Sequence, residues 1–265
     1  MYSGAPDRFI SYIWLTGNEF GPDRDFPEAQ QQWQHMLLLP RELSVKTIRN
    51  VFNNELVQEI GSWRVSGSTH GSKSSGHQNC VELETLGIDI ARETYEAITY
   101  ASDSFIVSFQ QSARGSALQS GFQILASDLE FTTIYYQFSN ESIVIDRSNS
   151  SAAARTTSGI DSYPESGRLR LFDVQEQCNQ KYDGDGEIDH DNENKQIETL
   201  DLTIVVDNSV LEVFANSRFG VSTWVRPWYA NSTEIRFFQN GDGEVTFRNI
   251  HVHDGLYDAY PARDR

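Results

Sequence analysis

Short β-rich runs recur through the second half of this sequence and constrain its fold more than any other feature. Each run is rich in Val, Ile, Phe, Tyr and Thr and ends at Gly, Asn, Asp or Ser. Polar and apolar positions alternate in residues 212–215 and 233–238, which is typical of antiparallel strands with one solvated face. The predicted strands are residues 9–15, 33–39, 105–110, 121–126, 132–138, 142–146, 168–174, 200–206, 210–215, 220–225, 232–239 and 244–251. With no βαβ pattern, they predict an all-β chain built around a two-sheet β-sandwich.

Turn signals and helical segments complete this prediction. Residues 206–210 join two of the runs as a hairpin would, and residues 239–243 carry Asn-Gly, a strong hairpin signal. Helical character is limited to residues 55–59 and 87–95. Residues 66–76 are rich in Gly and Ser, which favours an exposed loop or linker.

The charge balance narrows the class of ligand. The chain carries 38 acidic and 21 basic residues, for a formal net charge of −17. A surface of that sign repels phosphate backbones, so nucleic acid is not an expected partner, whereas neutral sugars meet no such penalty. The apolar runs are far shorter than the roughly 20 residues that cross a bilayer, so no membrane partner is expected.

The cysteines and histidines do not have the spacing of a metal site. Cys80 and Cys178 lie far apart and belong to no CxxC or Cys/His pattern, so they form either one disulfide or two buried thiols. The acidic tract 183–193 resembles a calcium loop at a few positions, but Lys181 and Asn192 stand where carboxylates should be, so a solvated insertion is expected. His251 and His253 share a strand face, and two ligands do not make a site. No cofactor or metal is predicted.

Three Asn-x-Ser/Thr sequons occur, at Asn140, Asn149 and Asn231. They are glycosylation sites only if the protein passes through a secretory pathway. No secretory signal is visible at the start of the chain.

Four segments together resemble the C-terminal part of glycoside hydrolase family 32, which includes invertases, inulinases and fungal fructosyltransferases. WQHMLLLPREL at residues 33–43 is similar to the strand that closes the last blade of the family's five-bladed propeller, and residues 10–19 to the strand before it. IVIDRS at residues 143–148 resembles a strand of the family's β-sandwich, and LTIVVDNSVLEVF at residues 202–214, followed by Asn216, resembles a hairpin of that sandwich. The resemblance implies a β-sandwich preceded by a remnant of the last propeller blade.

The family's catalytic motifs are absent from the sequence. Its nucleophile stands in a Trp-Met-Asn-Asp-Pro-like motif, its stabilising Asp in Arg-Asp-Pro and its acid/base Glu in Glu-Cys, and none of these occurs here. In residues 24–27, Phe26 interrupts the Arg-Asp-Pro pattern. No catalytic residue is therefore expected in this chain. The resemblance places Trp14 and Glu19 where they line outer sugar subsites, against the alternatives of a core Trp and a plain loop Glu. Arg41 and Glu42 are expected to join propeller and sandwich.

The resemblance also sets the predicted organisation and function. The predicted units are a blade remnant (1–48), a connecting segment (49–80), the β-sandwich (81–258) and a tail (259–265). The expected function is the C-terminal part of a β-fructofuranosidase-like enzyme acting on sucrose or fructans, inactive as this chain. A homodimer through the sandwich is an expected partner, and an extracellular location is favoured.

Two alternatives remain open at this stage. One is a free-standing carbohydrate-binding or oligomerisation module, in which Trp224, Trp228 and Tyr229 stack on sugar rings. The other is a degenerate product without function, because a lone blade would expose an unpaired apolar edge.

Overall fold

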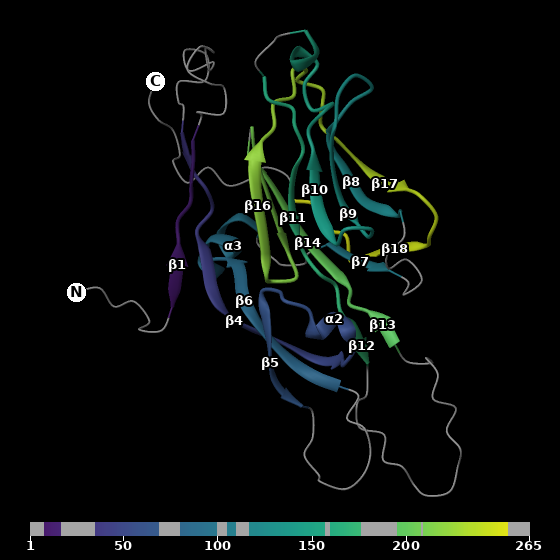
Figure 1. Cartoon of the computed structure of the whole chain (residues 1–265). Coiled ribbons are helices and arrows are strands. Elements are labelled where there is room, and N and C mark those ends of the chain that lie inside the picture. The colour runs from purple at the N-terminus through teal and green to yellow at the C-terminus, as the bar shows by residue number, and fades with distance from the viewer. Residues whose placement is uncertain are drawn as a thin grey trace, which may run out of the picture.

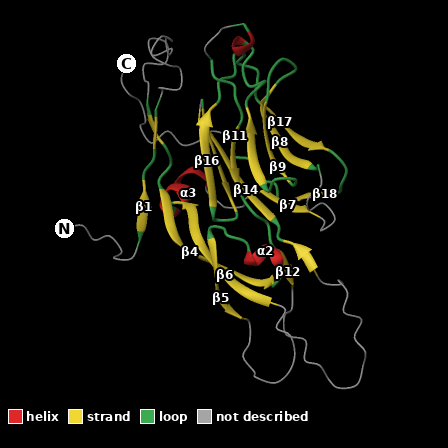
Figure 2. Cartoon of the chain, viewed as in Figure 1, coloured by secondary structure: helices red, strands yellow, loops and turns green. Residues whose placement is uncertain are grey.

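A computed structural model describes residues 8–16, 35–68, 80–99, 105–109, 117–156, 160–175, 195–207 and 209–253. The strands form three sheets and one isolated hairpin (Figures 1 and 2). Two of the sheets pack as the predicted β-sandwich, which confirms the all-β class. None of the helices in the described ranges has the length and apolar character needed to cross a membrane.

The first sandwich sheet, called the β8 sheet, has the order β11-β10-β9-β8-β17 and is antiparallel throughout. Its strands are β8 (Gln119–Ala126), β9 (Thr132–Gln137), β10 (Ser142–Asp146), β11 (Glu165–Arg168) and β17 (Glu234–Asn240). A 3-10 turn, η3 (Ala153–Arg155), lies between β10 and β11.

The second sandwich sheet, called the β14 sheet, has the order β16-β15-β14-β7-β18. Its strands are β7 (Phe105–Phe109), β14 (Leu200–Asp207), β15 (Val210–Ala215), β16 (Phe219–Trp224) and β18 (Val245–Arg248). The predicted hairpin at residues 206–210 is confirmed, because Asp207 pairs with Val210 where β14 turns into β15.

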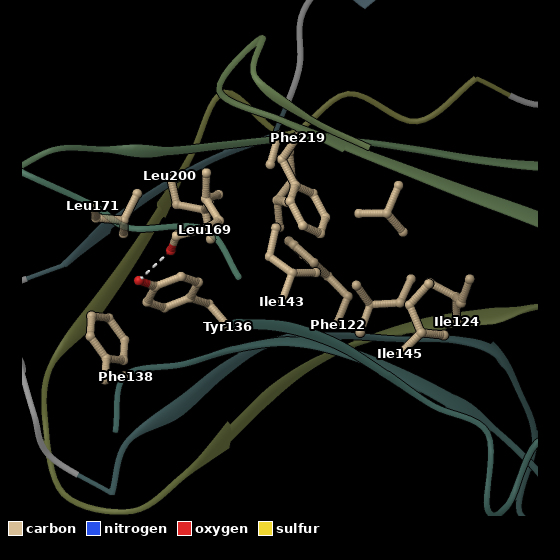
Figure 3. Close-up of a cluster of buried hydrophobic side chains, with 14 of the residues drawn as sticks. Phe122, Ile124, Tyr136, Phe138, Ile143, Ile145, Leu169, Leu171, Leu200 and Phe219 are labelled. Atoms are coloured by element: carbon tan, nitrogen blue, oxygen red, sulfur yellow. Dashed lines mark hydrogen bonds between the residues drawn. The ribbon is translucent and has the colours of Figure 1, made fainter. Parts of the chain in front are cut away.

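Period-two patterning builds the sandwich core. Leu211 and Val213 on β15 face inward, where Ile143 and Ile145 on β10 meet them in one cluster of buried side chains. Figure 3 shows this cluster, in which the Tyr136 hydroxyl donates a 2.9 Å hydrogen bond to the backbone oxygen of Leu169. The tyrosine therefore contributes apolar surface to the core while its polar end is satisfied.

The third sheet, called the flanking sheet, has the order β13-β12-β4-β6-β5, with β1 paired to β4. Its strands are β1 (Phe9–Ser11), β4 (Arg41–Phe52), β5 (Trp63–Ser68), β6 (Cys80–Ile90), β12 (Asp173–Gln175) and β13 (Lys195–Ile197). Helix α2 (Glu55–Gln58) confirms the first helical prediction. The second is right only in part, because residues 87–90 extend β6 and helix α3 runs over Arg92–Thr99.

The flanking sheet crosses the predicted unit boundaries. β4 continues without a break through residue 48, and β5 lies within the predicted connecting segment, where it pairs with β6. The division at residues 48 and 80 stays a prediction about the larger protein. In this chain, β4 pairs with β6 on both sides of residue 48, with a shift of register between Ile48 and Val51.

The Asn-Gly turn at residues 239–243 does not close a hairpin, contrary to the prediction. β17 pairs with β8 while β18 pairs with β7, so the chain crosses there from one sandwich sheet to the other. Gly241 has a φ of +90°, and a Cβ added to it would lie 2.9 Å from the carbonyl oxygen of Ala117. The glycine is thus required by a positive φ and a close backbone approach at the crossing.

Replacing Gly241 with alanine should lower the free energy of unfolding by about 1–2 kcal/mol, the cost of a left-handed conformation for a residue with a Cβ. Urea denaturation followed by circular dichroism measures this loss. Gly67→Ala is the matched control, because its Cβ would meet only Glu82 Oε2, at an ordinary 3.5 Å. Equal losses in the two variants would contradict the account of the crossing.

Candidate functional site

Of the two predicted sugar-subsite residues, Trp14 lies in a short hairpin at the N-terminal end of the described chain. β2 (Trp14–Leu15) pairs with β3 (Met36–Leu37), and the Trp14 ring lies 5.9 Å from the His35 ring, centroid to centroid. The Trp14 side chain is 59% exposed, so it is not a core residue among the described ranges. Glu19 lies outside the described residues, and the predicted subsite pair stays a prediction.

Six of the eighteen exposed large apolar side chains in the described ranges lie on or next to β1, β2 and β3. Phe9 is 70% exposed and Tyr12 is 63% exposed, and both belong to what we call the N-terminal apolar strip. The strip consists of Phe9, Ile10, Tyr12, Ile13, Trp14 and Leu37. A run of exposed large apolar side chains along consecutive strands is characteristic of a surface that another protein segment covers.

A buried ion pair anchors the start of β4 on the sandwich. Arg41 donates through Nη2 to Glu212 Oε2 at 3.3 Å and to Ser222 Oγ at 2.6 Å, and its guanidinium lies 5.3 Å from the Phe214 ring centroid. The backbone N–H of Leu39 donates to the other Glu212 oxygen at 2.8 Å. Both charged side chains are more than nine-tenths buried.

The alternation along β15 explains this arrangement. Leu211 and Val213 point into the sandwich core, so Glu212 and Phe214 must point to the opposite face. That face is also buried, because the segment that leads into β4 lies on it. Arg41 thus contacts the sandwich through Glu212, whereas the Glu42 side chain binds Arg8 instead. That Arg41 and Glu42 join a propeller to the sandwich stays a prediction.

A small apolar cluster fastens the β2–β3 hairpin beside this ion pair. Leu38, Val210 and Trp224 are buried together, and Leu15 and Met36 pack against them. The Trp224 indole N–H donates to the backbone oxygen of Thr16 at 3.1 Å. Trp224 is 3% exposed and so has no face available for a sugar ring. Trp228 and Tyr229 remain exposed, at 68% and 39%.

Arg147, in the motif at residues 143–148, is 1% exposed and holds two loops at one end of the sandwich. Its guanidinium donates to the backbone oxygens of Tyr163 at 2.9 Å and Trp224 at 3.2 Å. It also donates to the carboxylates of Glu165 at 3.1 Å and Asp161 at 3.3 Å. A planar guanidinium with five N–H donors can serve several acceptors at once, which a lysine cannot.

Glu130 also joins separate loops, but through a carboxylate that accepts hydrogen bonds. Its carboxylate accepts from the backbone N–H groups of Ala152 at 2.7 Å and Tyr229 at 2.8 Å, and from the Ser232 hydroxyl at 2.7 Å. Burial raises the pKa of the Glu130 carboxyl, but the hydrogen bonds, led by that from Tyr229, outweigh burial and hold the pKa below its usual value. Sequence reasoning missed this residue, because an acid after a strand carries no distinctive signal.

An exposed charge cluster ties β1 to helix α3. Arg8 donates to both carboxylate oxygens of Glu42, at 2.8 and 2.7 Å, and of Glu93, at 2.6 and 2.8 Å. These hydrogen bonds raise the pKa of Arg8, lower that of Glu42 and lower the pKa of Glu93 to about 2.

Because the folded-state pKa of Glu93 is depressed, its contribution to stability is fully present above its unfolded pKa of 4.5 and is lost as the pH falls toward about 2. Glu93→Gln should lower the melting temperature at pH 7, and the gap to the wild type should close between pH 5 and about 2. Added salt should narrow the gap as well, since the cluster is exposed. A gap that stays constant over that pH range would show that Glu93 does not act through this pair.

The remaining predicted sites have these positions. Asn140 and Asn231 are exposed in turns, and Asn149 is half-buried, with its amide 3.4 Å from Ser148 Oγ. Cys80 is buried at the start of β6 and is disulfide-bonded, and Cys178, the other cysteine of the chain, lies outside the described residues. Glycosylation stays a prediction. Within the described ranges, no group of three His, Cys, Asp or Glu side chains could hold a metal, and the acidic tract 183–193 lies outside them.

Residues 59–254 match the family model described as "Glycosyl hydrolases family 32 C terminal". The chain belongs to glycosyl hydrolase family 32. A search of curated proteins found no match. Two solved structures align with 97% of the chain. These are a beta-fructofuranosidase from Aspergillus kawachii in complex with glycerol, 50% identical with a TM-score of 0.81, and a wild-type fructosyltransferase from A. japonicus, 48% identical with a TM-score of 0.80.

The alignment covers 44% of the A. kawachii chain and 41% of the A. japonicus chain, so this chain spans about two-fifths of the length of these relatives. An exo-inulinase from A. awamori shares the fold at 16% identity, with a TM-score of 0.51 over 89% of this chain. The family 32 resemblance and the sandwich are thereby confirmed. That the strands before residue 48 are a propeller remnant stays a prediction.

Proposed function

We propose that this chain is the C-terminal part of a β-fructofuranosidase-like family 32 enzyme, whose reaction centre lies in a preceding part of the protein. The observation that carries the proposal is the pair of Aspergillus alignments: nearly the whole chain matches, at about half identity, a minor part of each relative. One relative is a beta-fructofuranosidase and the other a fructosyltransferase, so the proposed substrates are sucrose or fructans.

Chemistry supports a non-catalytic role for these residues. A retaining glycosidase needs a nucleophilic carboxylate and an acid/base carboxylate about 5–5.5 Å apart. The family motifs that supply them are absent from the sequence. The negative charge of the chain does not oppose a neutral sugar, which fits the proposed substrate class.

The proposed role of the chain is to support the catalytic part. The N-terminal apolar strip is an exposed surface for that part to cover. The Arg41–Glu212 pair and the Trp224 cluster attach to the sandwich the segments that follow and flank the strip. Trp14 belongs to this strip and is proposed to contact either the catalytic part or an outer sugar.

A free-standing sugar-binding module is the second candidate. The exposure of Trp228 and Tyr229 favours it, although Trp224, the third aromatic residue in that prediction, is buried. A homodimer through the sandwich is also proposed, and sedimentation velocity of the purified chain tests it directly.

Two measurements test the proposed function. The purified chain should release no glucose or fructose from sucrose, kestose or inulin. An antibody against the sandwich should detect a native protein more than twice the 30.1 kDa mass of this chain, because the chain spans about two-fifths of its relatives. Release of hexose by the chain alone, or a native band at the mass of the chain, would contradict the proposal.

A further inference from the structure

The sequence contains a single Asn-Gly pair, Asn240–Gly241, and the structure exposes it where the chain crosses between the two sandwich sheets. Asn240 is the last residue of β17, an edge strand that has β8 on one side only. Gly241 follows with its φ of +90° and its close approach to the Ala117 carbonyl, so the fold requires a glycine there. An exposed asparagine amide is thereby fixed next to a residue that has no Cβ.

The backbone nitrogen of Gly241 has no competing partner in the structure. Among the residues that the structure describes, no hydrogen bond engages the Gly241 N–H. The Asn240 side-chain amide donates to Gln119 Oε1 at 3.1 Å, and water can replace this bond because both side chains lie at the surface. The missing Cβ also leaves the path from the Gly241 nitrogen to the Asn240 side-chain carbon unobstructed.

The other asparagines that precede a small residue are restrained. The described ranges hold three Asn-Ser pairs, which begin at Asn149, Asn216 and Asn231. The nitrogen after Asn149 and the nitrogen after Asn231 each donate to a backbone oxygen, at 3.0 and 3.1 Å. The Asn216 side chain is held from both ends, because it accepts from the Asp201 N–H at 2.9 Å and donates to the Thr199 oxygen at 2.8 Å. Asn240 therefore differs from all three.

From these observations we propose that Asn240 is a site of spontaneous deamidation in the folded protein. The Gly241 nitrogen loses its proton and attacks the side-chain carbonyl carbon of Asn240. A carbon–nitrogen bond forms and closes a succinimide ring, while the side-chain amide nitrogen leaves as ammonia with that proton. Water then opens the ring. Cleavage at the former side-chain carbonyl gives aspartate, and cleavage at the backbone carbonyl gives isoaspartate.

The modification acts on the sandwich through its position. Both products add a negative charge, and isoaspartate also adds a methylene to the backbone at the end of β17. Beyond this point the chain enters β18, which pairs with β7 in the other sheet. Phe237 on β17 and Phe247 on β18 pack across the crossing with their ring centroids 4.8 Å apart. A longer backbone between them should disturb this packing, so the aged chain should melt at a lower temperature than the fresh chain.

The test is to incubate the purified, unglycosylated chain in native buffer at mildly alkaline pH and to map its peptides by tandem mass spectrometry. Circular dichroism before and after incubation establishes that the chain stays folded. The mass gain of amide-to-acid conversion should accumulate at Asn240 at least about tenfold faster than at Asn231, where the attacking nitrogen must first lose a hydrogen bond. A methyltransferase specific for isoaspartate gives a second readout.

Asn240→Gln should abolish the isoaspartate signal and the loss of melting temperature on ageing, because the longer side chain must close a larger ring. Asn231→Gln is the matched control and should leave both unchanged. Equal mass gains at Asn240 and Asn231, or a gain at Asn240 only in the urea-unfolded chain, would overturn the proposal. An isoaspartate signal without a mass gain that persists in Asn240→Gln would overturn it as well, because it would place the reaction at Asp242, which also precedes a glycine.

Discussion

Replacing Arg41 with alanine is expected to lower the free energy of unfolding of this chain by about 3–5 kcal/mol, the usual cost of removing one partner from a buried ion pair. The change would leave the buried Glu212 carboxylate without its cation. It would also remove the hydrogen bond to Ser222 and the contact with Phe214. Chemical denaturation followed by circular dichroism measures the loss.

Arg92→Ala is the control for this prediction. Arg92 pairs with Glu96 on the surface of α3, so its loss should cost no more than about 0.5 kcal/mol. In a Glu212→Ala background, Arg41→Ala should cost much less than in the wild type, because the two residues act as a unit. Additive effects of the two substitutions would show that the pair does not anchor β4.

Arg147→Ala is expected to be as damaging, with a loss of at least about 3 kcal/mol. The substitution removes four acceptor contacts of a side chain that is almost fully buried, and two of those acceptors are backbone oxygens at the ends of separate loops. Arg147→Lys should recover only part of the loss, because an ammonium cannot reach all four acceptors.

The melting temperatures of Arg147→Ala and Arg147→Lys should be measured together with that of a control variant, Arg168→Ala. Arg168 is 55% exposed and pairs with Glu141 and Glu59 at the surface, so its removal should change stability by less than about 1 kcal/mol. If Arg147→Ala behaves like Arg168→Ala, the buried guanidinium does not hold the loops.

The sandwich could be predicted from sequence because each of its strands buries one face, which places apolar residues at alternate positions. In β14 and β15, alternate side chains enter the core, and the short turn between them fixes the register. The motifs carried further information: the arginines of the segments at 33–43 and 143–148 are both buried and both bind across the chain. Their sequence positions gave no indication of which acceptors they reach.

The flanking sheet was not predicted, although its signal was present. Polar and apolar residues alternate from Leu43 to Lys46 and from Val81 to Glu84, but Thr47 and Thr85 then break the alternation, which leaves each run too short to stand out. The hairpin prediction at Gly241 was wrong for another reason. An Asn-Gly pair favours a tight turn, but which sheet receives the next strand is decided by long-range packing of β18 on β7.

Site residues were the least predictable feature. Trp14 was identified only through the family resemblance. Its role depends on what contacts its exposed ring, and the sequence of this chain does not encode that contact. The contacts of Glu130 join residues far apart in sequence, which a local motif cannot reveal.

The most direct test of the account is to mix this chain with the catalytic portion of the A. kawachii beta-fructofuranosidase, produced without the region that aligns here. We predict that the two parts associate, that the mixture hydrolyses sucrose faster than either part alone, and that replacing Phe9, Tyr12 and Trp14 with serine weakens the association. If the parts do not associate and activity does not rise, the proposal that this chain supports a catalytic part is wrong.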